Sequence, residues 1–268
     1  MIRAPNLTVA VFLALAPPAS AAKITLIVAD AEQARAASAR AGPDVSVRAF
    51  DRISLGDPIE KGRLLASVQG ADRVVSATRG KACGWLTHEI DGTPVDCVMP
   101  YDAIQVLDFA RAAGWRRVAV VHRTGYEKVY ARLNARARER GIVLVAVRVD
   151  GIRELPEALP RVLKTVQAVW ILGDPLLTEG AAFDYLVEST LARRVPLIGP
   201  GADLVARGVF LGADSDLSAM TRHAVGLANA AAKGAAPEDG AEEVPGGRLV
   251  VNRVLARRWG VSVPGGAK

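Results

Sequence analysis

The stretch that most constrains the fold is the apolar run Ala168–Ile171, which Leu172 extends and a Gly173-Asp174-Pro175 turn ends. A short unbroken apolar run that stops at turn residues is typical of a strand buried on both faces of a parallel sheet. The turn then lies at the carboxyl end of that strand, which is the edge where open α/β sheets bind ligands. The sequence therefore predicts that Asp174 lies at the rim of a ligand-binding crevice. A turn-forming role before Pro175 is the alternative.

The same unit of buried strand, polar turn and amphipathic helix recurs along the chain, and the pattern restarts near Pro100. We expect strands over 23–29, 45–50, 73–77, 94–99, 117–122, 142–149, 168–171, 195–198 and 209–212, and helices over 31–41, 59–68, 81–89, 101–113, 126–140, 177–193 and 253–259, with a further helix that begins near Asp214.

This alternation of strands and helices predicts parallel sheets joined by right-handed crossovers. Because the pattern restarts and the chain has 268 residues, we expect an α/β protein with two similar lobes of roughly 100–150 residues each. A single closed barrel of α/β units is the alternative fold.

Residues 1–22 have the features of a secretory signal peptide. The apolar run 7–16 is too short to span a bilayer, and Pro17-Pro18 ends it. Small residues then allow cleavage after Ala21 or Ala22. We therefore expect an exported, periplasmic protein, with an uncleaved N-terminal anchor as the alternative.

Charge and motifs argue against several other classes of protein. The formal net charge is +6, but Lys and Arg are interleaved with Asp and Glu, so we expect no nucleic-acid partner. His88, His122 and His223 lack the spacing of metal ligands, although His122 ends a strand and can reach the ligand edge. No phosphate-binding loop, dinucleotide-binding motif or Ser-His-Asp arrangement occurs. We expect no metal, no cofactor and no catalytic residues.

The sequence contains two cysteines, Cys83 and Cys97. An oxidising compartment favours a disulfide between them, and two separate buried thiols are the alternative. Two-lobed racemases use a pair of cysteines, so a cysteine enzyme is a further alternative. It is the less favoured one, because both cysteines fall in the first lobe.

The last third of the chain resembles the ABC-transporter substrate-binding proteins of the type I periplasmic-binding fold. Segments 166–200, 210–234 and 247–264 carry the resemblance, which closes with a strand, an asparagine, a short helix, a glycine and a proline. In this chain, that closing pattern runs from Val250-Val251-Asn252 through Gly260 to Pro264. Segments 72–86 and 94–103 lie where the family has its two N-lobe ligand loops.

The resemblance implies two Rossmann-like lobes joined by a hinge and closing on a small molecule. The first lobe would comprise residues 23–99 with 212–268, and the second lobe residues 100–211. It implies a monomer that delivers its small-molecule ligand to the permease of an ABC importer in the inner membrane. A ligand sensor that presents the same closed form to a membrane receptor or kinase is the alternative.

Two first-lobe loops contain candidate ligand contacts. Thr78, Arg79 and Gly80 precede an expected helix, whose free N–H groups can hold a carboxylate; an ordinary helix cap is the alternative. Tyr101 can stack on a ligand, and Asp102 can bind an ammonium group or simply favour the first turn of its helix.

In the second lobe, the candidates are Arg123, Thr124 and Tyr126 after the fifth strand, where the family has a contact loop, and Asp174, where the family often has an aspartate. The two rims then carry opposite chemistry: helix N–H groups and Arg79 suit an anion, whereas Asp174 and Asp102 suit a cation. Since a buried unpaired charge is costly, we expect an amino-acid-like zwitterion as the ligand.

Overall fold

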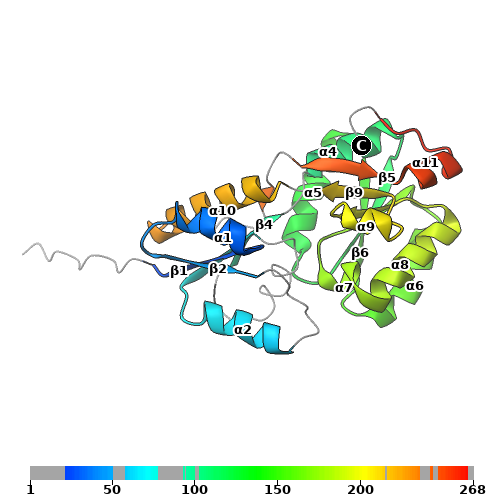
Figure 1. Cartoon of the computed structure of the whole chain (residues 1–268). Helices are drawn as coiled ribbons and strands as arrows, with labels where there is room; N and C mark the ends of the chain where they lie inside the picture. Colours follow the sequence, from blue (N-terminus) through cyan, green and yellow to red (C-terminus); the bar gives the residue numbers. More distant parts are fainter. Residues whose placement is uncertain are drawn as a thin grey trace, which may run out of the picture.

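The computed structural model describes residues 22–50, 58–77, 93, 95–99, 103–214, 216–235, 242–243 and 247–264. These residues form two separate sheets, each with helices on both faces (Figure 1). Among the described residues, no helix combines the length and apolar character required to cross a bilayer.

The first sheet has the strand order β10-β4-β3-β1-β2, and every pair is parallel. Two helices pack on one face and α2 packs on the other, each through apolar side chains. The elements are β1 (Ile24–Val28), α1 (Ala31–Ser38), β2 (Val45–Ala49), α2 (Pro58–Val68), β3 (Arg73–Ala77), β4 (Val95–Met99), α10 (Leu217–Ala232) and β10 (Glu242–Glu243), with α1 and α10 sharing a face.

The second sheet has the order β11-β9-β8-β7-β5-β6, and its strands are parallel except for the antiparallel pair of β11 and β9. Its strands are β5 (Arg117–His122), β6 (Val143–Arg148), β7 (Ala168–Ile171), β8 (Leu197–Pro200), β9 (Leu211–Asp214) and β11 (Arg248–Val251).

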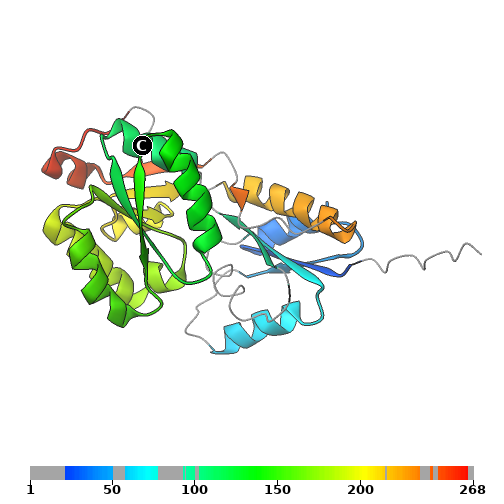
Figure 2. The same ribbon diagram turned by 180° about the vertical axis from the view of Figure 1, so that it is seen from behind.

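Helices α4 (Ala103–Ala112), α5 (Glu127–Glu139) and α11 (Arg253–Trp259) cover one face of this second sheet (Figure 2). The other face is covered by α6 (Leu155–Val162), α7 (Pro175–Thr178), α8 (Gly180–Arg193) and α9 (Asp203–Ala206), and a single turn, η1 (Ile152–Glu154), precedes α6.

The apolar run that opened the sequence analysis is strand β7. Trp170 packs into the core beneath α4 and α5, whereas Val169 and Ile171 pack into the core beneath α6 and α8. Because both faces of the strand are buried, the sequence shows a continuous apolar run rather than an alternating one. The predicted α/β fold is confirmed, and the barrel alternative is wrong because the strands form two sheets.

One predicted helix differs from the structure, and the helix expected over 81–89 lies outside the described residues. The helix expected over 177–193 is two helices, α7 and α8, which are separated at Glu179. Gly180 opens α8 with φ +59°, a left-handed conformation that glycine adopts without steric cost.

The C-terminal residues also divide differently from the expectation that all of 212–268 returns to the first lobe. Helix α10 and β10 do lie with the first sheet, but β9, β11 and α11 belong to the second (Figure 1). Backbone pairing of β11 with β9 and burial of Ala256 of α11 against the second core fix this placement. Neither interaction leaves a local signal in the sequence.

Thr221 of α10 provides a test of core packing. Its hydroxyl is buried and makes no hydrogen bond to the described residues, whereas the buried Thr190 hydroxyl of α8 donates to the carbonyl oxygens of Leu186 and Val187. An unsatisfied buried hydroxyl is destabilising, so Thr221→Val should raise the free energy of unfolding by about 1 kcal/mol. Thr190→Val is the matched control and should not stabilise. Chemical denaturation compares the two, and equal effects would contradict the assignment.

Candidate ligand-binding site

The strand order of the second sheet brings two loops together. Strand β5 lies between β6 and β7. After β5 the chain continues into α5 on one face of the sheet, whereas after β7 it continues into α7 and α8 on the opposite face. This is a topological switch point, where the carboxyl ends of neighbouring strands form a ligand-binding crevice in doubly wound sheets. The residues that follow the two strands are Arg123 and Asp174.

Asp174 is fully buried and is held by the start of α7. Its Oδ1 accepts a hydrogen bond from Leu176 N at 2.8 Å, and its carbonyl oxygen accepts from Leu177 N, Thr178 N and Thr178 Oγ1. The turn-forming role considered from the sequence is therefore present. It is compatible with a ligand role, because the carboxylate is fixed at the switch point.

Arg123 supplies a positive charge beside this carboxylate. Its Nη1 lies 3.7 Å from Asp174 Oδ1, and its side chain is 31% exposed. Its Nε is buried and makes no hydrogen bond to the described residues. Two charges of opposite sign thus meet at the carboxyl edge, one wholly buried and the other partly open to solvent.

Tyr126 completes this group from the start of α5. It is only 6% exposed and packs in the core beneath α4 and α5, so little of its ring is open to solvent. Burial raises the pKa of its hydroxyl, the Asp174 charge raises it further, and the Arg123 charge acts in the opposite direction. These effects place the Tyr126 hydroxyl within the electrostatic influence of both charges and keep it protonated at neutral pH.

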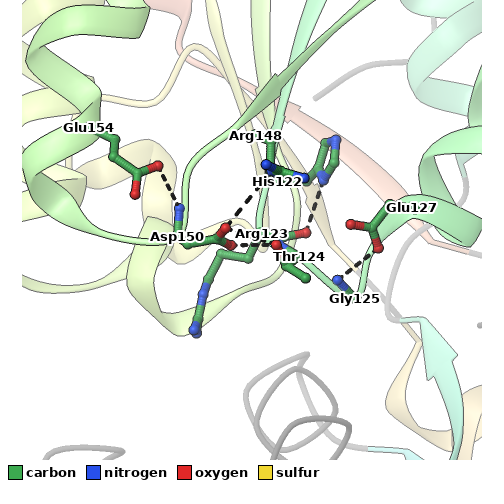
Figure 3. A network of polar contacts seen from close by, with 8 residues as sticks. All are labelled: His122, Arg123, Thr124, Gly125, Glu127, Arg148, Asp150 and Glu154. Carbon is green, nitrogen blue, oxygen red and sulfur yellow. Dashed lines mark hydrogen bonds and ion pairs between the residues drawn. The ribbon is translucent and has the colours of Figure 1, made fainter.

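A polar network holds the loop that carries Arg123 (Figure 3). Thr124 donates from its backbone N and its hydroxyl to the two carboxylate oxygens of Asp150, at 2.7 and 2.8 Å. Tyr126 N donates to the carbonyl oxygen of Arg123, and Gly125 takes φ +94° in the turn between them. Glu127 accepts from Gly125 N at 2.8 Å. The loop is therefore tied both to the turn that follows β6 and to the first residue of its own helix, α5.

His122, which was expected to reach the ligand edge, is instead a packing residue in this structure. It is 3% exposed, its ring stacks on Tyr130 at 5.4 Å between centroids, and its Nδ1 donates to the Arg123 carbonyl oxygen at 3.0 Å. Sequence reasoning missed Asp150. Its position two residues after the end of β6, at the same sheet edge as Arg123, was the available signal.

The remaining predicted contacts cannot be placed. Thr78, Arg79, Gly80, Tyr101, Asp102 and Cys83 lie outside the described residues. Only the backbone of Cys97 is described; it lies in β4 opposite Ser76 of β3, so the disulfide prediction stays untested. No cluster of potential metal ligands occurs among the described residues.

Asp150 gives a pH-dependent prediction. Hydrogen bonds from Thr124 lower the pKa of its carboxyl below 3.8, and the nearby charges of Arg148 and Arg123 act in the same direction. A folded-state pKa below the unfolded one means that the tether to Thr124 is fully present above the unfolded pKa and is lost as pH falls through the folded pKa. An NMR titration should therefore show the Thr124 amide shift changing with a midpoint below 3.8. In Asp150→Asn this transition should vanish. A midpoint at or above 3.8 would contradict the tether.

Two doubly wound lobes with charged side chains at a switch point define a two-lobed binding protein of the type I periplasmic-binding fold. The model of one family, ABC transporter substrate binding protein, matches residues 113–266, more than half of the chain. The protein therefore belongs to this family, which confirms the resemblance read from the sequence. No curated protein matches the chain significantly.

Solved structures agree with this fold. The ABC domain in complex with L-Trp from Streptococcus pneumonia is 15% identical, covering 90% of this chain and 96% of its own, with a TM-score of 0.56. A conserved domain protein from Vibrio cholerae is 14% identical, covering 92% and 97%, with a TM-score of 0.54. At such identities these likenesses concern the fold alone.

Proposed function

We propose that this substrate-binding protein of the ABC-transporter family is a periplasmic monomer without catalytic activity that carries an amino-acid-like zwitterion to an importer permease. The observation that supports the ligand class is the meeting of Arg123 and Asp174 at the switch point of the second sheet. An ammonium group on the ligand can pair with the buried Asp174 carboxylate beside Arg123, whereas a neutral sugar brings no charge to this carboxylate.

We propose further that the first lobe consists of residues 23–99 with α10 and β10, and that its loops complete the site. Thr78, Arg79 and Gly80 would hold the ligand carboxylate, and Tyr101 and Asp102 would lie close to the hinge. The solved structure in complex with L-Trp has the same fold as this chain, and its ligand agrees with the proposed amino-acid class.

The test is to purify the protein from its native periplasm, denature it and identify the released compound by mass spectrometry. Calorimetry with a panel of amino acids, amines, organic acids and neutral sugars then measures affinity. Binding of a zwitterion, together with a smaller radius of gyration in solution scattering, is the expected result. Binding of neutral sugars alone would overturn the ligand class, and an unchanged scattering profile across the panel would overturn the transport role.

A ligand sensor remains the second candidate function, since a closed lobe pair can equally be presented to a membrane receptor or kinase. Uptake of the identified ligand by intact cells separates the two candidates. Deleting the protein should abolish high-affinity uptake if it serves a transporter, and should leave uptake unchanged if it serves a sensor.

A further inference from the structure

The two members of the Arg123–Asp174 pair are held to very different degrees. Asp174 is fully buried, and α7 fixes both its carboxylate and its carbonyl group through hydrogen bonds from three successive residues (Leu176, Leu177 and Thr178). It cannot leave its position without unfolding the start of that helix. A buried carboxylate in a fixed place requires a cation beside it at all times, because an unpaired buried charge is strongly destabilising.

The Arg123 side chain is held much less firmly. Its Nη1 is 3.7 Å from Asp174 Oδ1, which is longer than a direct hydrogen bond, and its Nε has no hydrogen-bond partner among the described residues. The guanidinium therefore does not make the close two-point contact that gives arginine–carboxylate pairs their strength. Its exposed fraction of 31% also leaves the side chain a way out toward solvent.

The backbone beneath this side chain is fixed. Asp150 holds Thr124 through two hydrogen bonds, and the Arg123 carbonyl oxygen accepts from both His122 and Tyr126. Figure 3 shows the Arg123 side chain pointing away from these contacts. The guanidinium can therefore move about its own side-chain torsions while the loop keeps its conformation.

From this asymmetry we propose that the position of the Arg123 guanidinium beside Asp174 is an exchangeable organic-cation site. Arg123 is its resident cation, and the ammonium group of an incoming ligand displaces it. The identity of the displacing cation, the ammonium group of an amino-acid-like ligand, rests on the proposed function. An ammonium is more compact than a guanidinium and can donate directly to the carboxylate, and Asp174 stays paired throughout the exchange.

Arg123 then determines affinity and specificity by competing with the ligand. Arg123→Met keeps much of the apolar stem but removes the competing charge, so ligands with an ammonium group should bind about 3–10-fold more tightly, a gain of about 0.7–1.4 kcal/mol. If Arg123 instead holds the ligand carboxylate directly, the same substitution would weaken binding. The sign of the change separates the two roles.

The decisive experiment uses simple cations as probes and is independent of the natural ligand. Arg123→Ala removes the Arg123 charge from its place beside Asp174 and should lower the melting temperature. Adding ethylguanidinium or methylammonium chloride should then raise it again in a saturable way, by about 3–6 °C at ten times the dissociation constant. Sodium chloride at equal ionic strength should not do so, and wild-type protein should respond weakly.

Three variants complete this experiment. Arg193→Ala removes an exposed arginine from α8 and should show no rescue. The double variant Arg123→Ala with Asp174→Asn should no longer gain melting temperature from the organic cations. If the Arg123→Ala protein does not fold, Arg123→Met takes its place in the experiment. Equal responses to sodium and to the organic cations, or rescue that persists in the double variant, would overturn the exchangeable site. The proposed function would be unaffected, because it depends on the ligand panel and not on these probes.

Discussion

Asp174→Asn is expected to lower the affinity for the ligand identified by the panel by about 100-fold or more. The substitution keeps the size of the side chain and an oxygen that can accept from Leu176 N, so α7 should still begin at the same place. What it removes is a fully buried negative charge. Truncating one partner of a buried charge pair typically costs 2–5 kcal/mol of binding free energy, and calorimetry measures the change directly.

Glu188→Gln provides the matched control for this measurement. Glu188 lies on α8 and is exposed, so its charge is screened by water and contributes little. Affinity in this variant should stay within a factor of about two of wild type. An unchanged affinity in Asp174→Asn, with the circular dichroism of the folded protein intact, would remove Asp174 from the ligand site.

The position of Asp174 was predictable because two local signals agree. The continuous apolar run gives the buried strand β7, and the residues after such a strand lie at the ligand edge of the sheet. Its complete burial and its pairing with Arg123 could not be predicted. Both depend on β7 lying next to β5, and the alternation of strands and helices does not fix the order of strands in a sheet.

Tyr126 shows how two sequence signals compete at one residue. It follows a strand in a loop that we expected to contact the ligand, and it also shares a helical face with Leu133 and Ala137. The structure buries all three in the core beneath α4 and α5. The helical spacing was therefore the better guide to burial, and a contact between the Tyr126 ring and a ligand stays a prediction.

Asp150 was overlooked for the opposite reason. An aspartate before a glycine is an ordinary turn signal, so it attracted no functional hypothesis. Its hydrogen bonds to Thr124 arise only because β5 and β6 are neighbours in the sheet. The rule that identified Asp174, applied to every strand, would have placed Asp150 at the same edge.

The largest effect on stability is expected at Gly212, in the middle of β9. Strand β9 pairs with β8 on one side and with β11 on the other, so it connects the edge strand β11 to the rest of the second sheet. A Cβ at residue 212 would clash with the backbone carbonyl of Gly201 and would lie 2.8 Å from Cγ2 of Val205. Gly201 cannot withdraw, because its own N–H donates to the Ala213 carbonyl oxygen at 2.7 Å.

Gly212→Ala should therefore lower the free energy of unfolding by about 3 kcal/mol or more, because the clash is with backbone and forces strand separation. Gly226→Ala is the matched control. Gly226 is exposed in the interior of α10, and an added Cβ meets no atom within 4 Å. Alanine should stabilise that helix by about 1 kcal/mol through its higher helix propensity. Chemical denaturation measures both variants, and a Gly212→Ala protein as stable as wild type would show that β8 and β9 do not approach each other as the structure describes.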